Sequence, residues 1–199
     1  RTMVARLAAT LVRGLGEPMR LSGRQVFLGS SVGVALFPDD AASASLLMKN
    51  GDIAMYQAKV AGKNCYRFYS RAMDQAVERR VHMEQELRGA WERGELSLLY
   101  QPIVRLSDKR VVGAEALLRW QHPMRGFVSP AVFIPIAEQS GLMPALGERV
   151  LSRAMHDWHS WPHLEVSVNL SPVQFRQPDL LAMLERLLAQ HDADARHFV

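Results

Sequence analysis

The segment from Val111 to Trp120 places a carboxylate and a guanidinium inside an otherwise apolar run, VVGAEALLRW. In an extended strand, side chains alternate between the two faces, so Glu115, Leu117 and Arg119 point one way and the residues between them point the other. Charged groups on a covered sheet face are costly unless they meet a metal ion, a phosphate or each other. The segment therefore predicts a strand with one packed face and one face for chemistry. An internal Glu115–Arg119 salt bridge is the alternative.

A short turn separates this strand from a second extended segment. The turn, Ser107-Asp108-Lys109, is too short to hold a crossover helix, so the strands at 96–106 and 110–120 must run antiparallel. Apolar periodicity then predicts alternating helices and strands. The expected elements are helices at 130–139 and 144–160, a strand at 164–171 and a helix at 179–189. This part of the chain therefore indicates an α/β fold.

The first seventy residues contain a second set of elements. Residues 1–14 predict a helix with one apolar face, and a hairpin is expected about Ser22-Gly23-Arg24. Its first strand is expected at 19–21, and its second is expected to run without a break from 25 to 37. Ser43 is a suitable N-cap for a following helix. A further helix is expected from Gly51-Asp52 to Lys59, and a short aromatic strand at 66–69.

The stretch from Ser70 to about Arg93 is rich in charge and moderately amphipathic, which predicts a helix. Arg80 and Glu84 interrupt the heptad that a coiled-coil seam would need. We therefore expect an interdomain spacer, and a homodimer of a longer protein is left open as the alternative.

Composition limits the kinds of partner. The formal net charge is +4, and the basic residues are scattered, which favours a solvated basic surface over a nucleic-acid-binding patch. The lone Cys65 excludes an internal disulfide and fits a reducing compartment. No apolar stretch approaches the roughly 20 residues that a membrane helix needs. We expect a cytoplasmic chain with no nucleic-acid partner and no membrane segment, while an anchor preceding Arg1 stays open.

Several sequence motifs carry a family resemblance. They are LLYQPIV at 98–104, EAL at 115–117, WQHP at 120–123, FIPIAE at 133–138 and VNLS at 168–171. In this order they closely resemble the first half of the EAL domain, the family of cyclic-di-GMP phosphodiesterases. The resemblance implies a partial TIM-like (β/α) barrel at 94–199 whose first strand is antiparallel.

The preceding residues resemble a second family. SVGVALFP at 31–38, DIAMYQAK at 52–59 and GKN at 62–64 are similar to the C-terminal half of the GGDEF, or diguanylate cyclase, domain. The resemblance implies a partial cyclase-like α/β sandwich at 1–69, joined by a linker helix at 70–93 to the EAL part. It also implies that Lys59 and Lys63 contact the nucleotide phosphates, although Arg is more usual at position 63. Two solvated lysines at a helix end are the alternative.

The EAL resemblance implies roles for five residues. Glu115 and Asn169 would be metal ligands, Arg119 would contact a substrate phosphate, and Gln101 and Leu117 would line the dinucleotide pocket. Carboxylate and amide oxygens suit Mg²⁺ or Mn²⁺. Each metal candidate is expected towards the carboxyl end of its strand, where barrel enzymes build their sites. From the residue pattern alone, Gln101 could equally satisfy loop backbone beside Pro102.

The implied reaction is hydrolysis of cyclic di-GMP to linear pGpG with two divalent ions. Residues 94–199 are less than half of the roughly 250 residues in a complete eight-unit barrel. We therefore expect a piece of a longer tandem GGDEF–EAL protein that is inactive alone, because two protein ligands cannot organise a two-metal site. The alternative is a catalytically silent receptor or scaffold that binds the dinucleotide or a partner protein.

Overall fold

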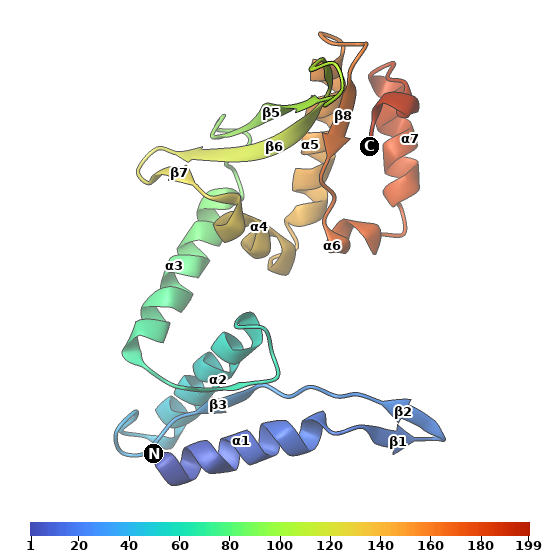
Figure 1. Ribbon diagram of the computed structural model, residues 1–199. Helices are drawn as coiled ribbons and strands as arrows, with labels where there is room; N and C mark the ends of the chain where they lie inside the picture. Colours follow the sequence, from blue (N-terminus) through green and yellow to red (C-terminus); the bar gives the residue numbers. More distant parts are fainter. The chain divides into compact units, whose positions relative to one another are not determined.

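The computed structural model describes all residues from 1 to 199 and divides into two compact units (Figure 1). The first unit is Arg1–Arg80 and the second is Val81–Val199. Helix α3 (Arg71–Leu87) begins in the first unit and ends in the second. No helix in the chain is both long enough and apolar enough to cross a bilayer.

The first unit contains a βαβ arrangement. Strands β3 (Val32–Val34) and β4 (Tyr66–Phe68) are parallel, and helix α2 (Ala44–Val60) connects them. The side chain of Ser43 caps α2 by accepting a hydrogen bond from Leu46 N. The remaining elements are helix α1 (Thr2–Gly16) and the antiparallel hairpin β1 (Met19–Leu21) and β2 (Arg24–Val26).

Two expectations for the first unit are wrong. The hairpin strand does not continue from 25 to 37, because residues 27–31 leave the hairpin and β3 then pairs with β4 in a separate sheet. The helix expected to begin at Gly51 is instead the second half of α2. Gly51 does not start a helix but lies inside α2, and it is Gly33 of β3 that lets the backbone of α2 approach closely at Gly51 and Met55.

This close approach gives a prediction about stability. A Cβ atom added to Gly33 would lie 2.0 Å from Gly51 O and 2.3 Å from Met55 N, both of which are backbone atoms. Gly33→Ala must therefore displace α2, and we expect the first unit to lose about 1–3 kcal/mol. Hydrogen exchange of the α2 amides would measure this loss.

The matched control lies on the other side of the same contact. A Cβ atom at Gly51 would meet nothing within 4 Å. Because Gly51 lies inside a helix, Gly51→Ala is expected to gain roughly 0.5–1 kcal/mol. Equal or slower exchange in Gly33→Ala than in the unmodified chain would contradict the close packing of α2 on β3.

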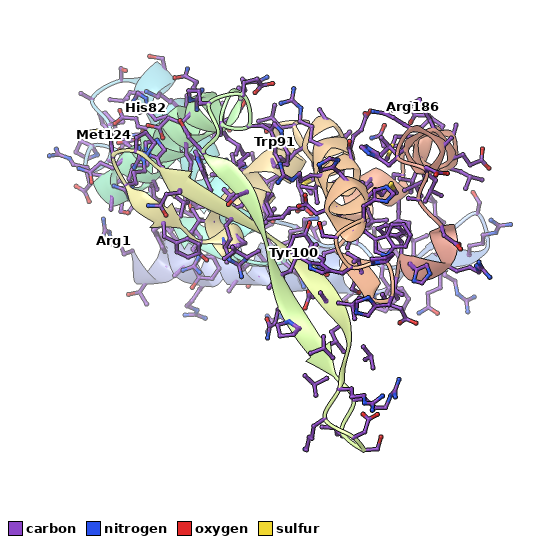
Figure 2. The ribbon with its side chains drawn as sticks, turned by 90° about the horizontal axis from the view of Figure 1, so that it is seen from above. Arg1, His82, Trp91, Tyr100, Met124 and Arg186 are labelled. Atoms are coloured by element: carbon purple, nitrogen blue, oxygen red, sulfur yellow. The ribbon has the colours of Figure 1, made fainter.

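The second unit is built around a mixed sheet. Strand β6 (Val111–His122) pairs antiparallel with β5 (Leu96–Val104) and with β7 (Gly126–Val128), and parallel with β8 (Glu165–Val168). The predicted antiparallel pairing of the first two strands is thus confirmed. The β5–β6 hairpin extends beyond the helices of its own unit (Figure 2). At the far edge of β8, Val199 N donates to Val166 O and Val168 N donates to Val199 O.

Helices cover one face of this sheet (Figure 1). They are α4 (Pro130–Gln139), α5 (Met143–Trp158), the single turn α6 (Pro172–Phe175) and α7 (Leu180–Gln190), followed by a 3₁₀ turn at Ala195–His197. Trp120 of β6 is fully buried against Phe133 of α4, with ring centroids 5.6 Å apart. Ala116 and Val166 pack beside Ala154 and Trp158 of α5. The residues predicted to point away from Glu115 therefore form the core.

Some boundaries in the second unit differ from the predictions. Helix α3 ends at Leu87 instead of Arg93, because residues 88–94 form turns in which Ala90 N donates to Leu87 O three residues back, not four as in an α-helix. Strand β6 continues to His122, because the unpredicted strand β7 pairs with its last three residues. The turn α6 was also not predicted.

Candidate functional site

A row of polar side chains crosses three neighbouring strands on the face of the sheet away from the core. Gln101 of β5 lies opposite Glu115 of β6, and Glu115 lies opposite Ser167 of β8. Asn169 comes two residues after Ser167 and therefore faces the same side. Its Nδ2 donates a hydrogen bond of 2.7 Å to Glu115 Oε1. The structure thus brings Gln101, Glu115 and Asn169 together.

Leu117 and Arg119 continue this face along β6. They lie opposite Leu99 and Ser97 of β5, respectively. The Arg119 guanidinium is half-buried and donates from Nη1 to the backbone oxygen of Leu118 at 3.0 Å. It forms no salt bridge with Glu115, so the alternative of an internal ion pair along β6 is not found.

Strand β5 is fixed from its other face, at the residue before Gln101. The hydroxyl of Tyr100 donates to Asp157 Oδ2 of α5 at 2.9 Å, and Arg153 Nε donates to the same oxygen at 3.0 Å. Burial, followed by the hydrogen bond to Asp157, raises the pKa of Tyr100 well above its usual value, so the phenol stays protonated. Since neighbouring residues of a strand face opposite ways, this anchor directs Gln101 to the polar face.

One expectation about the site needs correction. Glu115 does not lie near the carboxyl end of its strand, because β6 runs on for seven further residues to His122. Strand β8 is much shorter and ends at Val168, opposite Ala116. The strand expected at 164–171 is thus shorter than predicted, and Asn169 follows its end instead of lying inside it; Asn169 meets a carboxylate from the middle of the neighbouring strand.

The chemistry of this pair fits a divalent metal ion. A carboxylate and a carboxamide provide hard oxygen donors, and the two side chains lie within hydrogen-bond distance. The chain contains no group of three or more His, Cys, Asp or Glu side chains placed to hold a metal ion. Glu115 and Asn169 could therefore contribute two ligands, and the other ligands of an ion here would have to come from water or from elsewhere.

Three residues around the turn after β8 were missed from the sequence. Ser171 and Gln174 are buried and form a reciprocal capping box at the start of α6. Glu138 of α4 accepts a hydrogen bond from the Ser171 hydroxyl. The spacing Ser-x-x-Gln is itself a helix-start signal and could have identified the first two. Glu138 is the last residue of the FIPIAE motif, but no local pattern indicates that it contacts Ser171, which is distant in the sequence.

In the first unit, Lys59 and Lys63 are both exposed near the carboxyl end of α2. Lys63 has a positive φ of 62°, and its backbone N–H donates to Ala58 O. Lysines at this end of a helix are favoured by the helix dipole whether or not a ligand is present. Their contact with nucleotide phosphates stays a prediction.

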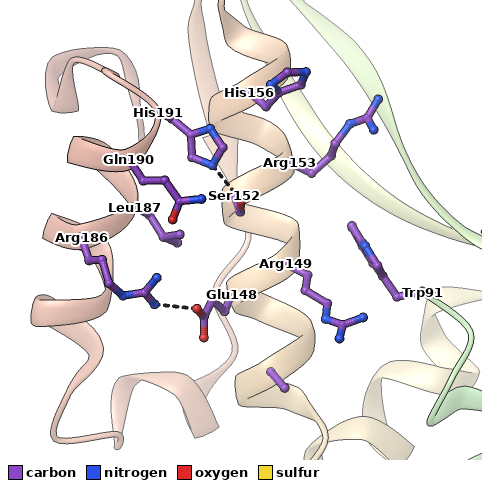
Figure 3. Close-up of a pocket in the computed structure, with 11 residues that line it drawn as sticks. Trp91, Glu148, Arg149, Ser152, Arg153, His156, Arg186, Leu187, Gln190 and His191 are labelled. Atoms are coloured by element: carbon purple, nitrogen blue, oxygen red, sulfur yellow. Dashed lines mark hydrogen bonds and ion pairs between the residues drawn. The ribbon is translucent and has the colours of Figure 1, made fainter.

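A separate hollow of the second unit lies among its helices (Figure 3). It has a volume of about 630 Å³ and lies between α5, α7 and Trp91. Its arginines are already paired with carboxylates, so little uncompensated charge is left for an anion. The pairs are Arg149 with Glu92, Arg153 with Asp157, and Arg186 with Glu148. This hollow does not include the polar row.

Comparison with known families agrees with this geometry. Residues 84–199 match the EAL domain family, and residues 1–65 match the diguanylate cyclase, GGDEF domain family. The first match covers more than half of the chain, so the chain belongs to the EAL domain family. It carries GGDEF sequence ahead of the EAL sequence, as predicted, and its fold is that of a TIM-like EAL barrel in part.

Individual relatives match almost the whole chain. An uncharacterised signalling protein of Caulobacter vibrioides is 43% identical over 94% of this chain and 23% of its own length. The bifunctional diguanylate cyclase/cyclic di-GMP phosphodiesterase MucR of Pseudomonas aeruginosa is 36% identical over 98% of this chain and 29% of its own. The chain thus spans about a quarter of the length of these relatives.

A solved structure supports the assignment of the second unit. The PaMucR phosphodiesterase in its cyclic-di-GMP complex superposes with a TM-score of 0.57 and 36% identity, over 59% of this chain and 49% of that one. Phosphodiesterases of the EAL family depend generally on divalent metal ions. Cyclic di-GMP is the ligand with which this relative was solved.

Proposed function

We propose that this chain is part of a cyclic-di-GMP phosphodiesterase that hydrolyses the cyclic dinucleotide to linear pGpG. The observation that supports this proposal most is the row of Gln101, Glu115 and Asn169 across three neighbouring strands. In this proposal the GGDEF part is residues 1–69, the linker is 70–93 and the EAL part is 94–199. The lysines of the GGDEF part would belong to a separate nucleotide site.

The residues of the polar face have three proposed roles. Glu115 and Asn169 hold Mg²⁺ or Mn²⁺ through their side-chain oxygens. Bound divalent ions supply a water that is activated near neutral pH and neutralise charge on the leaving oxygen. Arg119 orients a substrate phosphate, because its planar guanidinium can donate two parallel hydrogen bonds. Gln101 and Leu117 form the wall of the dinucleotide pocket.

A catalytically silent receptor or scaffold is the second candidate. It is compatible with the finding that no group of three or more His, Cys, Asp or Glu side chains in this chain is placed to hold a metal ion. Such a protein would use the same polar face to bind the dinucleotide without hydrolysing it. The presence of both a carboxylate and an amide in contact favours the enzyme, because binding a nucleotide alone does not require them.

Two proteins should be compared in an assay with Mn²⁺ and cyclic di-GMP, with formation of pGpG as the readout. One is residues 1–199, and the other is the same chain extended through a complete EAL barrel. We expect turnover by the extended protein and no turnover by residues 1–199. Binding without hydrolysis by the extended protein would establish the receptor instead. Turnover by residues 1–199 that Glu115→Ala abolishes would contradict the expected need for further ligands.

A further inference from the structure

We propose that Glu138 of α4 is a positioning residue for Asn169. Through Ser171 it fixes the turn after β8, and this turn holds the Asn169 carboxamide against Glu115. The contacts from Glu138 to Asn169 do not depend on the proposed function. Their effect on metal binding rests on the proposed function.

The first contact joins α4 to the end of β8. Ser171 Oγ donates to Glu138 Oε1 at 2.5 Å, across 33 residues of sequence. Ser171 is only 7% exposed. Short hydrogen bonds from a hydroxyl to a carboxylate are about twice as strong as neutral ones, and burial of the hydroxyl shields this one from competing water. Glu138 therefore restrains the turn from outside it through a charge-assisted hydrogen bond.

The second set of contacts holds the same serine from within the turn. The backbone N–H of Ser171 donates to Gln174 Oε1 at 3.0 Å, and Val173 N donates to Ser171 Oγ at 3.2 Å. Ser171 thus takes part in three hydrogen bonds through its side chain and backbone N–H. Its backbone can rotate only if several of them break together.

Gln174 is placed by helix α5. It is 1% exposed, and its Nε2 lies so close to Gly147 that a Cβ atom there would be 2.0 Å away. The same Nε2 is buried and has no hydrogen-bond partner. Leaving a buried donor unpaired costs stability. The orientation of the amide that leaves Nε2 unpaired is the one in which Oε1 accepts the hydrogen bond from Ser171 N.

These restraints reach Asn169 through a single intervening residue. Asn169 lies between Val168, the last paired residue of β8, and Leu170, which is followed by Ser171. The side chain of Asn169 is exposed, and its one hydrogen bond is to Glu115. Because solvent does not restrain this side chain, its position depends on the backbone, which β8 holds on one side and the Glu138–Ser171 contact holds on the other.

The test uses residues 1–199 labelled for NMR, with two readouts at Asn169. One is the solvent exchange and chemical shift of the Asn169 side-chain amide, which report its hydrogen bond to Glu115 without any metal. The other is the Mn²⁺ concentration that broadens this signal by half. In Glu138→Ala we expect faster exchange of the Asn169 side-chain amide and an increase of about 10-fold in the Mn²⁺ concentration that broadens its signal by half. Ten-fold is the lower limit for loss of an outer-shell partner of a metal ion.

Three further variants separate positioning from general destabilisation. Glu138→Gln keeps an oxygen that can accept from Ser171 and is expected to restore both readouts close to those of the unmodified chain. Gly147→Ala leaves Glu138 intact but displaces Gln174, and is expected to impair Asn169 in the same way as Glu138→Ala. Glu148→Ala removes a surface carboxylate of α5 that pairs with Arg186, and should change neither readout.

The outcomes distinguish this proposal from the proposed function. Unchanged exchange and shift of Asn169 in a folded Glu138→Ala chain would overturn the positioning role. If Glu138→Ala does not fold, Ser171→Ala removes the other partner of the same hydrogen bond, and an Asn169 signal in that variant that matches the unmodified chain would overturn it. If Mn²⁺ leaves Asn169 unaffected in the unmodified chain, the proposed metal site fails, while the exchange data still decide the positioning role.

Discussion

In the chain extended through a complete EAL barrel, Glu115→Ala is expected to lower the rate of cyclic-di-GMP hydrolysis by at least about 100-fold. This is the upper limit for loss of an outer-shell partner of a metal ion, and a direct ligand should matter at least as much. The substitution removes a proposed ligand and also the acceptor of the Asn169 hydrogen bond. The fold should survive, because Glu115 is on the face of the sheet away from the core. Initial rates of pGpG formation at saturating Mn²⁺ would measure the effect.

Two controls make this result specific. Glu165 of β8 is an exposed carboxylate on the same face as Ser167, so Glu165→Ala removes equal charge and should leave the rate unchanged. Glu115→Gln can still accept from Asn169 but lacks the negative charge, and is expected to be nearly as inactive as Glu115→Ala. A Glu115→Ala protein with a normal rate would show that this carboxylate is not a metal ligand.

Trp120→Ala is expected to have the largest effect on stability, about 3–5 kcal/mol for the second unit. Trp120 is fully buried, packs edge to face on Phe133, and donates from Nε1 to Glu95 Oε2 at 3.0 Å. The substitution leaves a cavity beside α4 and removes a hydrogen bond from a carboxylate. Urea unfolding followed by far-UV circular dichroism would measure the loss, since three other tryptophans complicate fluorescence.

Phe127→Ala is the matched control for this substitution. Phe127 lies on β7, which pairs with the same end of β6, but it is 58% exposed. Its truncation should change stability by no more than about 0.5 kcal/mol, as is usual for surface positions. Similar unfolding midpoints for the two variants would show that Trp120 does not anchor the sheet to α4.

The face of β6 that carries Glu115 was predictable because strand alternation is a local property. Glu115, Leu117 and Arg119 must share a face in any extended conformation of this segment. The short turn at 107–109 likewise allows only antiparallel pairing with the preceding strand. The family resemblance then added Asn169, which periodicity alone places on a strand but not next to a particular neighbour.

Other features depend on contacts between distant segments and were not predictable in this way. The break at 27–31 arises because β3 finds its partner in β4, more than thirty residues later. The extension of β6 to His122 depends on β7, whose three residues give a weak strand signal. The contact between Glu138 and Ser171 joins a helix to a turn in the following β–α unit, and no sequence periodicity relates these two positions.

The most direct test of the site is a Mn²⁺ titration of isotopically labelled residues 1–199, with paramagnetic broadening recorded for every amide. We predict that the side-chain amide of Asn169 and the backbone amides around Glu115 broaden first, and that Glu115→Ala removes this selectivity. Broadening that begins at another group of carboxylates, or that is the same in Glu115→Ala, would contradict a shared divalent ion between β6 and β8.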